Sequence, residues 1–147
     1  MKRPVTDRQI HWLGYAGLLP FIVLALLLWL VTPDLHPYVA LALAGWGAVV
    51  VSFLGGIHWG IGFRLAASGF PAPRIHFIWG AVPAMLAWIA IIMPAYAGLP
   101  LLGLILVACY GVDRHTWPEA GLGPWLPMRF KLTLVATISC LFAAGGT

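Results

Sequence analysis

The sequence predicts an all-α integral membrane protein, a bundle of five transmembrane helices with its N-terminus inside and its C-terminus outside. The first observation is composition: 62% of the 147 residues are hydrophobic and only 8% are charged. A soluble domain of this length needs far more charge to cover its surface. The second is that several apolar runs approach the roughly 20 residues needed to cross a hydrocarbon core. The third is the one-sided distribution of basic residues described below.

We expect residues 1–147 to form a single membrane domain whose helices are punctuated by proline. Pro20 interrupts the first helix and removes one backbone donor, so the carbonyl of Ala16 needs another partner. Pro83 is a kink in the third helix, and Pro100 favours a regular fourth helix only from about Leu99. The expected helices span residues 12–31, 38–63, 76–93, 95–112 and 127–145.

The basic residues fix the expected orientation. All eight Lys and Arg residues precede the first helix or flank the second and fourth loops, on one side of the expected bundle. They are Lys2, Arg3, Arg8, Arg64, Arg74, Arg114, Arg129 and Lys131. The positive-inside rule then places the N-terminus in the cytoplasm and the C-terminus outside. Arg129 and Lys131, in the opening turns of the last helix, are expected to snorkel to the headgroups.

Small residues mark a predicted packing surface on the second helix. Ser52, Gly56 and Gly60 follow one another at spacings of four and therefore share one helix face, with Gly55 beside it. Helices in lipid associate by close backbone approach rather than by hydrophobic drive. This glycine-rich face is expected to touch another helix.

One titratable side chain lies deep in the same helix. His58 is six positions before Arg64, about 9 Å inside the boundary at 1.5 Å per residue. Asp113 lies near the same level at the end of the fourth helix. We expect His58 to approach Asp113, Tyr110 or a water between them, while Trp59 closes one side of a small cavity and Arg114 keeps the carboxylate ionised. The candidate ligand-binding residues are His58, Trp59, Tyr110, Asp113 and Arg114.

Three interpretations of this cluster remain open on the residues alone. His58 can be structural, hydrogen-bonded across a helix interface. It can belong to a small-molecule site for a quinone headgroup, a lipid headgroup or a porphyrin. It can also ligate a metal or haem, although no pair such as H-x3-H supports that hypothesis and we name no metal ligand. No catalytic signature is present, and no cofactor is identified.

Three blocks of the sequence resemble a known family. They are FLGGIHWG in the second helix, YGVDR at the end of the fourth and PWLPMRFKLTLVATIS entering the fifth. In this order and spacing they are similar to the membrane family called domain of unknown function 3429, over nearly the whole chain. The resemblance implies a multi-helix membrane protein in an energy-transducing membrane, because the family has bacterial and mitochondrial members. It implies no activity.

The expected function is that of a small inner-membrane accessory or assembly factor, packed against a larger membrane complex such as a respiratory one. The alternative is a ligand-handling protein that binds a lipid-soluble cofactor near His58. A weaker alternative is a proton or small-solute pathway. The expected partners are membrane lipids and another membrane protein or a second copy of the chain, with no nucleic acid.

Overall fold

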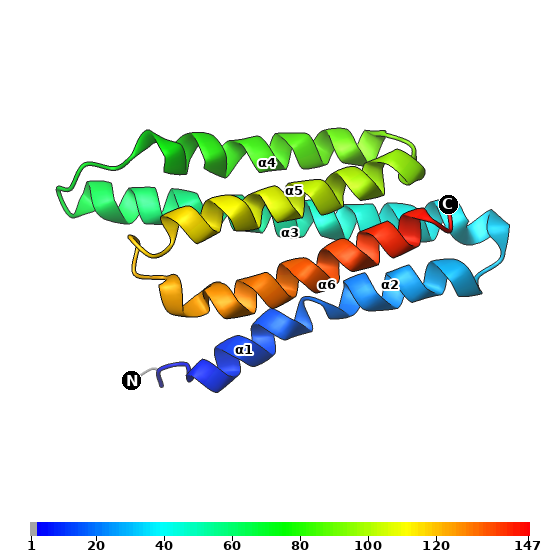
Figure 1. Ribbon diagram of the computed structural model, residues 1–147, viewed down its shortest axis with the longest axis horizontal. Helices are drawn as coiled ribbons and strands as arrows, with labels where there is room; N and C mark the ends of the chain where they lie inside the picture. The colour runs from blue at the N-terminus through cyan, green and yellow to red at the C-terminus, as the bar shows by residue number, and fades with distance from the viewer. Residues whose placement is uncertain (1–2) are drawn as a thin grey trace.

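The computed structural model describes residues 3–147, and all the regular secondary structure in these residues is helical (Figure 1). Proline or glycine starts or interrupts most helices, as the sequence indicates. The elements are α1 (Asp7–Ala16), α2 (Leu19–Leu30), the 3₁₀ turn η1 (Pro33–Leu35), α3 (His36–Ala67), α4 (Arg74–Ile92), α5 (Ala95–Thr116), the 3₁₀ turn η2 (Gly123–Trp125) and α6 (Leu126–Ala144).

The first membrane crossing is made of two helices, not one. The expected single helix over 12–31 is therefore wrong in its start and in its continuity. The chain enters α1 at Asp7 through a capping box, in which Thr6 and Gln9 satisfy each other's backbone amides. It breaks before Pro20, and the indole of Trp46 donates to the Gly17 carbonyl at 3.0 Å. A neighbouring helix thus bonds a backbone carbonyl at the break, one residue after the Ala16 carbonyl that Pro20 leaves without its donor.

The later helices match the expected ones in place, but two extend further. α3 has 32 residues and is about 48 Å long, well beyond a hydrocarbon core of about 30 Å. It therefore continues past both ends of the expected 38–63. α5 runs to Thr116 instead of ending near Val112, so Asp113 lies inside a helix. α4 and α6 begin and end within two residues of the expectation.

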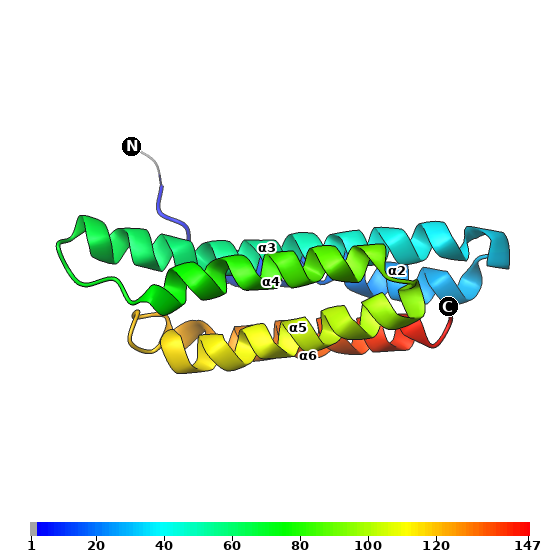
Figure 2. The same ribbon diagram turned by 90° about the horizontal axis from the view of Figure 1, so that it is seen from above.

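The helices form two layers that run along one axis. α3 packs along α4 and α5 packs along α6, and Figure 2 shows these pairs stacked on one another. α2 packs against both α3 and α6. The described residues contain five helical segments long and apolar enough to cross a membrane. Their exposed side chains include many Leu, Ile, Phe and Trp residues, so the outer surface suits lipid rather than water.

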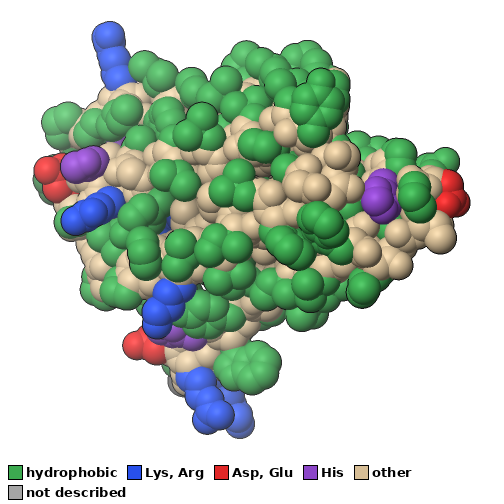
Figure 3. All heavy atoms as spheres, turned by 45° about the vertical axis from the view of Figure 1, so that its right-hand side comes forward, with side chains coloured by type: hydrophobic (Ala, Val, Ile, Leu, Met, Phe, Trp, Pro, Cys, Tyr) green, Lys and Arg blue, Asp and Glu red, His purple; other side chains and the backbone are tan. Residues whose placement is uncertain are grey.

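The two ends of the bundle differ in charge. The start of α1, the α3–α4 loop and the α5–α6 loop meet at one end, while the C-terminus lies at the other (Figure 1). Arg3 precedes α1, and every other Lys and Arg in residues 3–147 belongs to a helix that begins or ends at the first end, here called the basic end. Figure 3 shows them gathered there, apart from a broad apolar surface. Lys2 lies outside the described residues, and the side of the membrane that the basic end faces stays a prediction.

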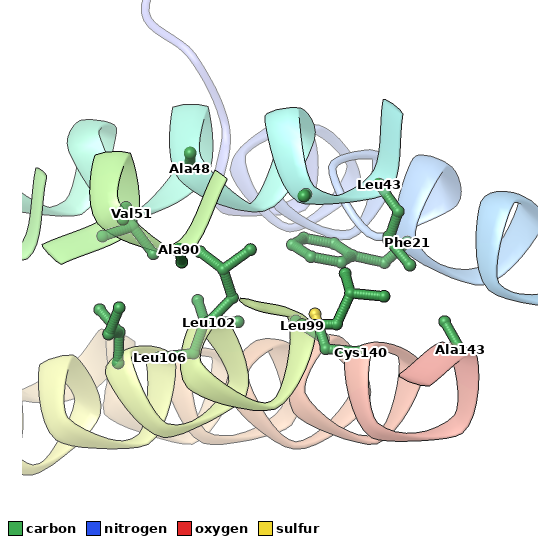
Figure 4. Close-up of a cluster of buried hydrophobic side chains, with 14 of the residues drawn as sticks. Phe21, Leu43, Ala48, Val51, Ala90, Leu99, Leu102, Leu106, Cys140 and Ala143 are labelled. Carbon is green, nitrogen blue, oxygen red and sulfur yellow. The ribbon is translucent and has the colours of Figure 1, made fainter. Parts of the chain in front are cut away.

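The core away from the basic end is made of aliphatic and small side chains. Figure 4 shows Phe21 of α2 against Leu43 of α3, with Leu99 of α5 beside Cys140 of α6 and Leu102 farther along α5. All five are at most 1% exposed. The buried side chains of this cluster are apolar. Two side-chain hydrogen bonds also join these helices there, from Trp29 to the Phe142 carbonyl and from Thr137 to the Gly103 carbonyl.

Close backbone approach occurs at glycine, though not on the predicted face. A Cβ at Gly55 would collide with the Gly80 carbonyl oxygen of α4, and one at Gly80 would collide with the Trp59 ring. Around Gly56 and Gly60 nothing lies within 4 Å of such an atom, and Ser52 donates to its own helix at Ala48. The contact inside this chain therefore uses Gly55 and not Gly56 or Gly60, and contact of that outer face with a partner stays a prediction.

Candidate functional site

Four ionisable side chains from four helices meet near the basic end. They are His58 of α3, His76 of α4, Asp113 of α5 and Arg129 of α6, here called the polar network. None is more than 5% exposed. His76 and Arg129 fall in the first turns of their helices and Asp113 in the last turn of α5, so these three side chains lie at the same end of the bundle. Burial of so many polar groups is tolerable only when all are paired.

The contacts join the four side chains into a chain. His58 Nδ1 lies 3.1 Å from His76 Nδ1, and His58 Nε2 lies 2.7 Å from Asp113 Oδ1. The other carboxylate oxygen, Asp113 Oδ2, accepts from Arg129 Nε at 3.0 Å and from Arg129 Nη2 at 2.8 Å. Arg129 Nη1 donates to the hydroxyl of Thr133, one turn on, at 2.9 Å. The expected approach of His58 to Asp113 is thus present in the structure.

The donors and acceptors of the polar network determine which of its ring nitrogens carry protons. Asp113 bears two guanidinium donors on one oxygen and so acts as a carboxylate, which makes His58 Nε2 a donor. Between the two Nδ1 atoms there is room for one proton only. With both rings neutral, His76 Nδ1 carries it and donates to His58. The network then has no net charge, because Asp113 and Arg129 offset each other.

Arg129 turns into the bundle, which corrects the expectation that it snorkels to the headgroups. It is 4% exposed, and its guanidinium carbon lies 5.8 Å from the centre of the Trp117 ring. The ring face and the Asp113 carboxylate replace the water that the cation would have found outside. Trp117 Nε1 is the one fully enclosed side-chain nitrogen or oxygen without a hydrogen-bond partner in residues 3–147. Such unpaired buried donors are rare.

An apolar cavity opens beside the cationic end of the network. It lies between α1, α3 and α6, and its volume is about 540 Å³. Its walls are mainly aliphatic, and the lining includes three side chains of the network or in contact with it, Arg129, Thr133 and Trp117. The volume is within the usual range for small-molecule sites, about 300–1,000 Å³, and few polar groups in an apolar wall are typical of them.

Three of the predicted site residues lie elsewhere. Trp59 points away from the cavity, donates to the Phe77 carbonyl at 3.0 Å and packs edge-on against Phe63 and Phe77. Tyr110 packs against the ring of Phe130. Arg114 is exposed, and Arg129 takes the role beside Asp113 that was expected of it. Of the alternative partners expected for His58, the structure shows Asp113. The expectations that Trp59 closes one side of a cavity with His58 and that Arg114 accompanies Asp113 are wrong.

The sequence interpretation missed His76, Arg129, Thr133 and Trp117 as members of the site. One signal was available: Arg129 and Thr133 are four residues apart and so share a face of the last helix. Within residues 3–147 no three His, Cys, Asp or Glu side chains are placed to hold a metal ion. Both nitrogens of His58 are already engaged.

Comparison with known proteins places the whole chain in one group. The family described as protein of unknown function (DUF3429) matches residues 6–145. Transmembrane protein 69 of Xenopus tropicalis is 34% identical over 142 residues, 92% of this chain and 52% of that protein. Transmembrane protein 69 of Mus musculus is 33% identical over 134 residues, 87% of this chain and 52% of that protein. The chain spans about half the length of these relatives. No solved structure matches it.

Proposed function

Since the chain belongs to the family described as protein of unknown function (DUF3429) and is a multi-pass membrane protein, we propose that it binds a lipid-soluble molecule in the cavity between α1, α3 and α6. The observation that carries this proposal is that Arg129 of the polar network and its hydrogen-bond partner Thr133 also line the cavity. An apolar molecule with a polar head would lie along the aliphatic wall and present that head to them.

The energetics of the network support a functional role. A buried ion pair adds little stability relative to apolar residues of the same volume, because desolvation offsets its attraction. Ionisable residues within membrane segments are costly and usually mark a pathway or a site. The apolar core at the other end shows that this bundle packs without such groups.

Filling the cavity tests the proposal. Gly14 of α1 lines it, and a Cβ there would meet the flexible ends of Met128 and Leu132. We expect Gly14→Leu to fold and to lose the bound molecule, because its side chain occupies the cavity. Gly45→Leu is the matched control, since nothing lies within 4 Å of a Cβ at Gly45. The measurement is mass spectrometry of small molecules that purify with each variant in mild detergent. Equal retention by all three proteins would contradict the proposal.

A second candidate is the accessory or assembly factor expected from the sequence. One observation favours it: Gly56 and Gly60 face outward with open space around them, which leaves room for a helix of another membrane protein. Gly56→Leu would then lose a stoichiometric protein partner on native purification and leave the chain folded. Purification of the unaltered protein without any protein partner would count against this candidate.

We further propose that the protein resides in a bacterial inner membrane with its basic end in the cytoplasm. The one-sided placement of Lys and Arg supports this orientation. A reporter fused after Thr147 should be active only in the periplasm, and one inserted between Pro118 and Gly121 only in the cytoplasm. Activity of both reporters on one side would contradict the orientation.

A further inference from the structure

Arg129 has hydrogen-bonding capacity that the protein leaves unused. A guanidinium carries five N–H groups in a planar fork. Three of them are engaged in the structure, by Asp113 and Thr133. The remaining two have no partner in residues 3–147, and the side chain lines the cavity. One of the two is on Nη1 and the other on Nη2, and an oxyanion such as a carboxylate or phosphate is the group to which a guanidinium donates most strongly.

An oxyanion beside Arg129 would upset the charge balance of the network. Asp113 already neutralises the cation at 2.8 Å, so the bound anion would leave one negative charge in a buried, apolar place. Two like charges sharing such a site favour uptake of a proton by one of the groups. His58, in contact with Asp113 at 2.7 Å, is the base within reach.

His76 lies between His58 and the surface of the bundle. Its Nδ1 faces His58, while its Nε2 has no hydrogen-bond partner and is not among the fully enclosed atoms of the described chain. His76 is in the first turn of α4, at the basic end. Two further titratable groups are close enough to interact electrostatically with the network. Glu119 is near His76, and Cys109 lies one turn before Asp113. Neither is hydrogen-bonded to the network.

Resting on the proposed function, we propose that the cavity binds a lipid-soluble oxyanion, an alkyl chain ending in a carboxylate or a similar group, and that its binding draws one proton from the basic end through His76 to His58. The proton adds to His76 Nε2, and the proton on His76 Nδ1 moves to His58 Nδ1. His58, already protonated at Nε2, becomes an imidazolium that donates to both Asp113 and His76. His76 is left neutral, with its proton on Nε2.

The test uses the protein in discs of phosphatidylcholine, with hexadecanesulfonate as the probe. A sulfonate does not titrate, so any proton uptake seen with an indicator dye in unbuffered solution near pH 7 belongs to the protein. We expect about one proton per bound sulfonate, and none with hexadecanol. His58→Gln should bind the sulfonate without that uptake, whereas His115→Gln, an exposed histidine at the same end, should behave as the unaltered protein.

Two more variants separate the steps. Arg129→Lys keeps the charge beside Asp113 but loses the fork, so sulfonate binding should weaken about tenfold or more. His76→Gln should slow proton uptake in a stopped-flow trace. If phosphatidylglycerol in the disc competes with the sulfonate, the natural source of the oxyanion is an acidic phospholipid. If it does not compete, the natural source is a free acid.

The outcomes distinguish this inference from the proposed function. Binding of hexadecanol as tightly as of hexadecanesulfonate, or sulfonate binding without proton uptake, would overturn the oxyanion inference and leave the cavity as a binding site. Undiminished proton uptake by His58→Gln would overturn the route. Binding of neither probe, together with retention of no molecule on purification, would overturn the proposed function as well.

Discussion

The two ends of the bundle bury different kinds of side chain at the same helix interfaces. Near the basic end, α3, α4, α5 and α6 meet through His58, His76, Asp113 and Arg129. Farther along, α3, α5 and α6 meet through Leu43, Leu99, Leu102 and Cys140 (Figure 4). The apolar region packs without any charged side chain. We propose that the polar region serves the cavity beside Arg129 in addition to packing.

The largest effect should come from removing the acid at the centre of the network. Asp113→Ala leaves Arg129 and His58 buried without their partner, at a cost of about 3–5 kcal/mol. Asp34→Ala, at an exposed acid in η1, is the control and should be close to neutral. The measurement is the free energy of unfolding in detergent. Equal losses for the two variants would mean that the Asp113 ion pair does not form.

A smaller loss is expected in the apolar region. Leu99 is fully buried, and Leu99→Ala should cost about 2–3 kcal/mol through the space it leaves, in the lower part of the range for such changes. The reason is that lipid is as apolar as the leucine, so the transfer contribution is weak. Ligand retention should not change. Loss of the bound molecule in Leu99→Ala would break the functional separation of the two regions.

The level of the polar residues along the membrane could be predicted from the sequence, but their direction around each helix could not. Counting from Arg64 placed His58 and Asp113 at one depth, and they are in contact. Successive residues are about 100° apart on a helix, so Trp59 faces Phe77 while its neighbour His58 faces the network. The same rotation separates Asp113 from the exposed Arg114.

Arg129 shows the limit of sequence reasoning most plainly. A cation in the opening turn of a membrane helix is expected to reach the headgroups. It turns inward here because α5 continues four residues beyond the expected end and presents Asp113 to α6. The helical crossings themselves followed from hydropathy, since lipid leaves backbone groups no other partners. The break in the first crossing was marked by Pro20, but the carbonyl that Trp46 contacts belongs to Gly17 and not to Ala16, the residue expected from the position of Pro20.

The smallest effects should appear where the two regions join, at the contact of α3 with α4. Gly55→Ala pushes its Cβ into the Gly80 carbonyl and should cost about 1–3 kcal/mol. By separating α3 from α4 it should also weaken the His58–His76 contact. Gly56→Ala, one residue on, faces open space and should be neutral or slightly stabilising, because alanine favours the helix. The measurement is the free energy of unfolding of the two variants. A larger loss for Gly56→Ala than for Gly55→Ala would mean that Gly56, and not Gly55, lies at the interface.

The most direct test of the central claim, that the polar network serves the cavity and not the packing, replaces the network as a whole. The triple variant His58→Leu, Asp113→Leu, Arg129→Met keeps similar volume and leaves no unpaired charge. Because apolar replacement of a buried charged cluster is often neutral or stabilising, we expect its free energy of unfolding to equal or exceed that of the unaltered protein. We also expect it to purify without the bound molecule. A triple variant that unfolds would show that the network is structural, and one that retains the molecule would show that the network does not hold it.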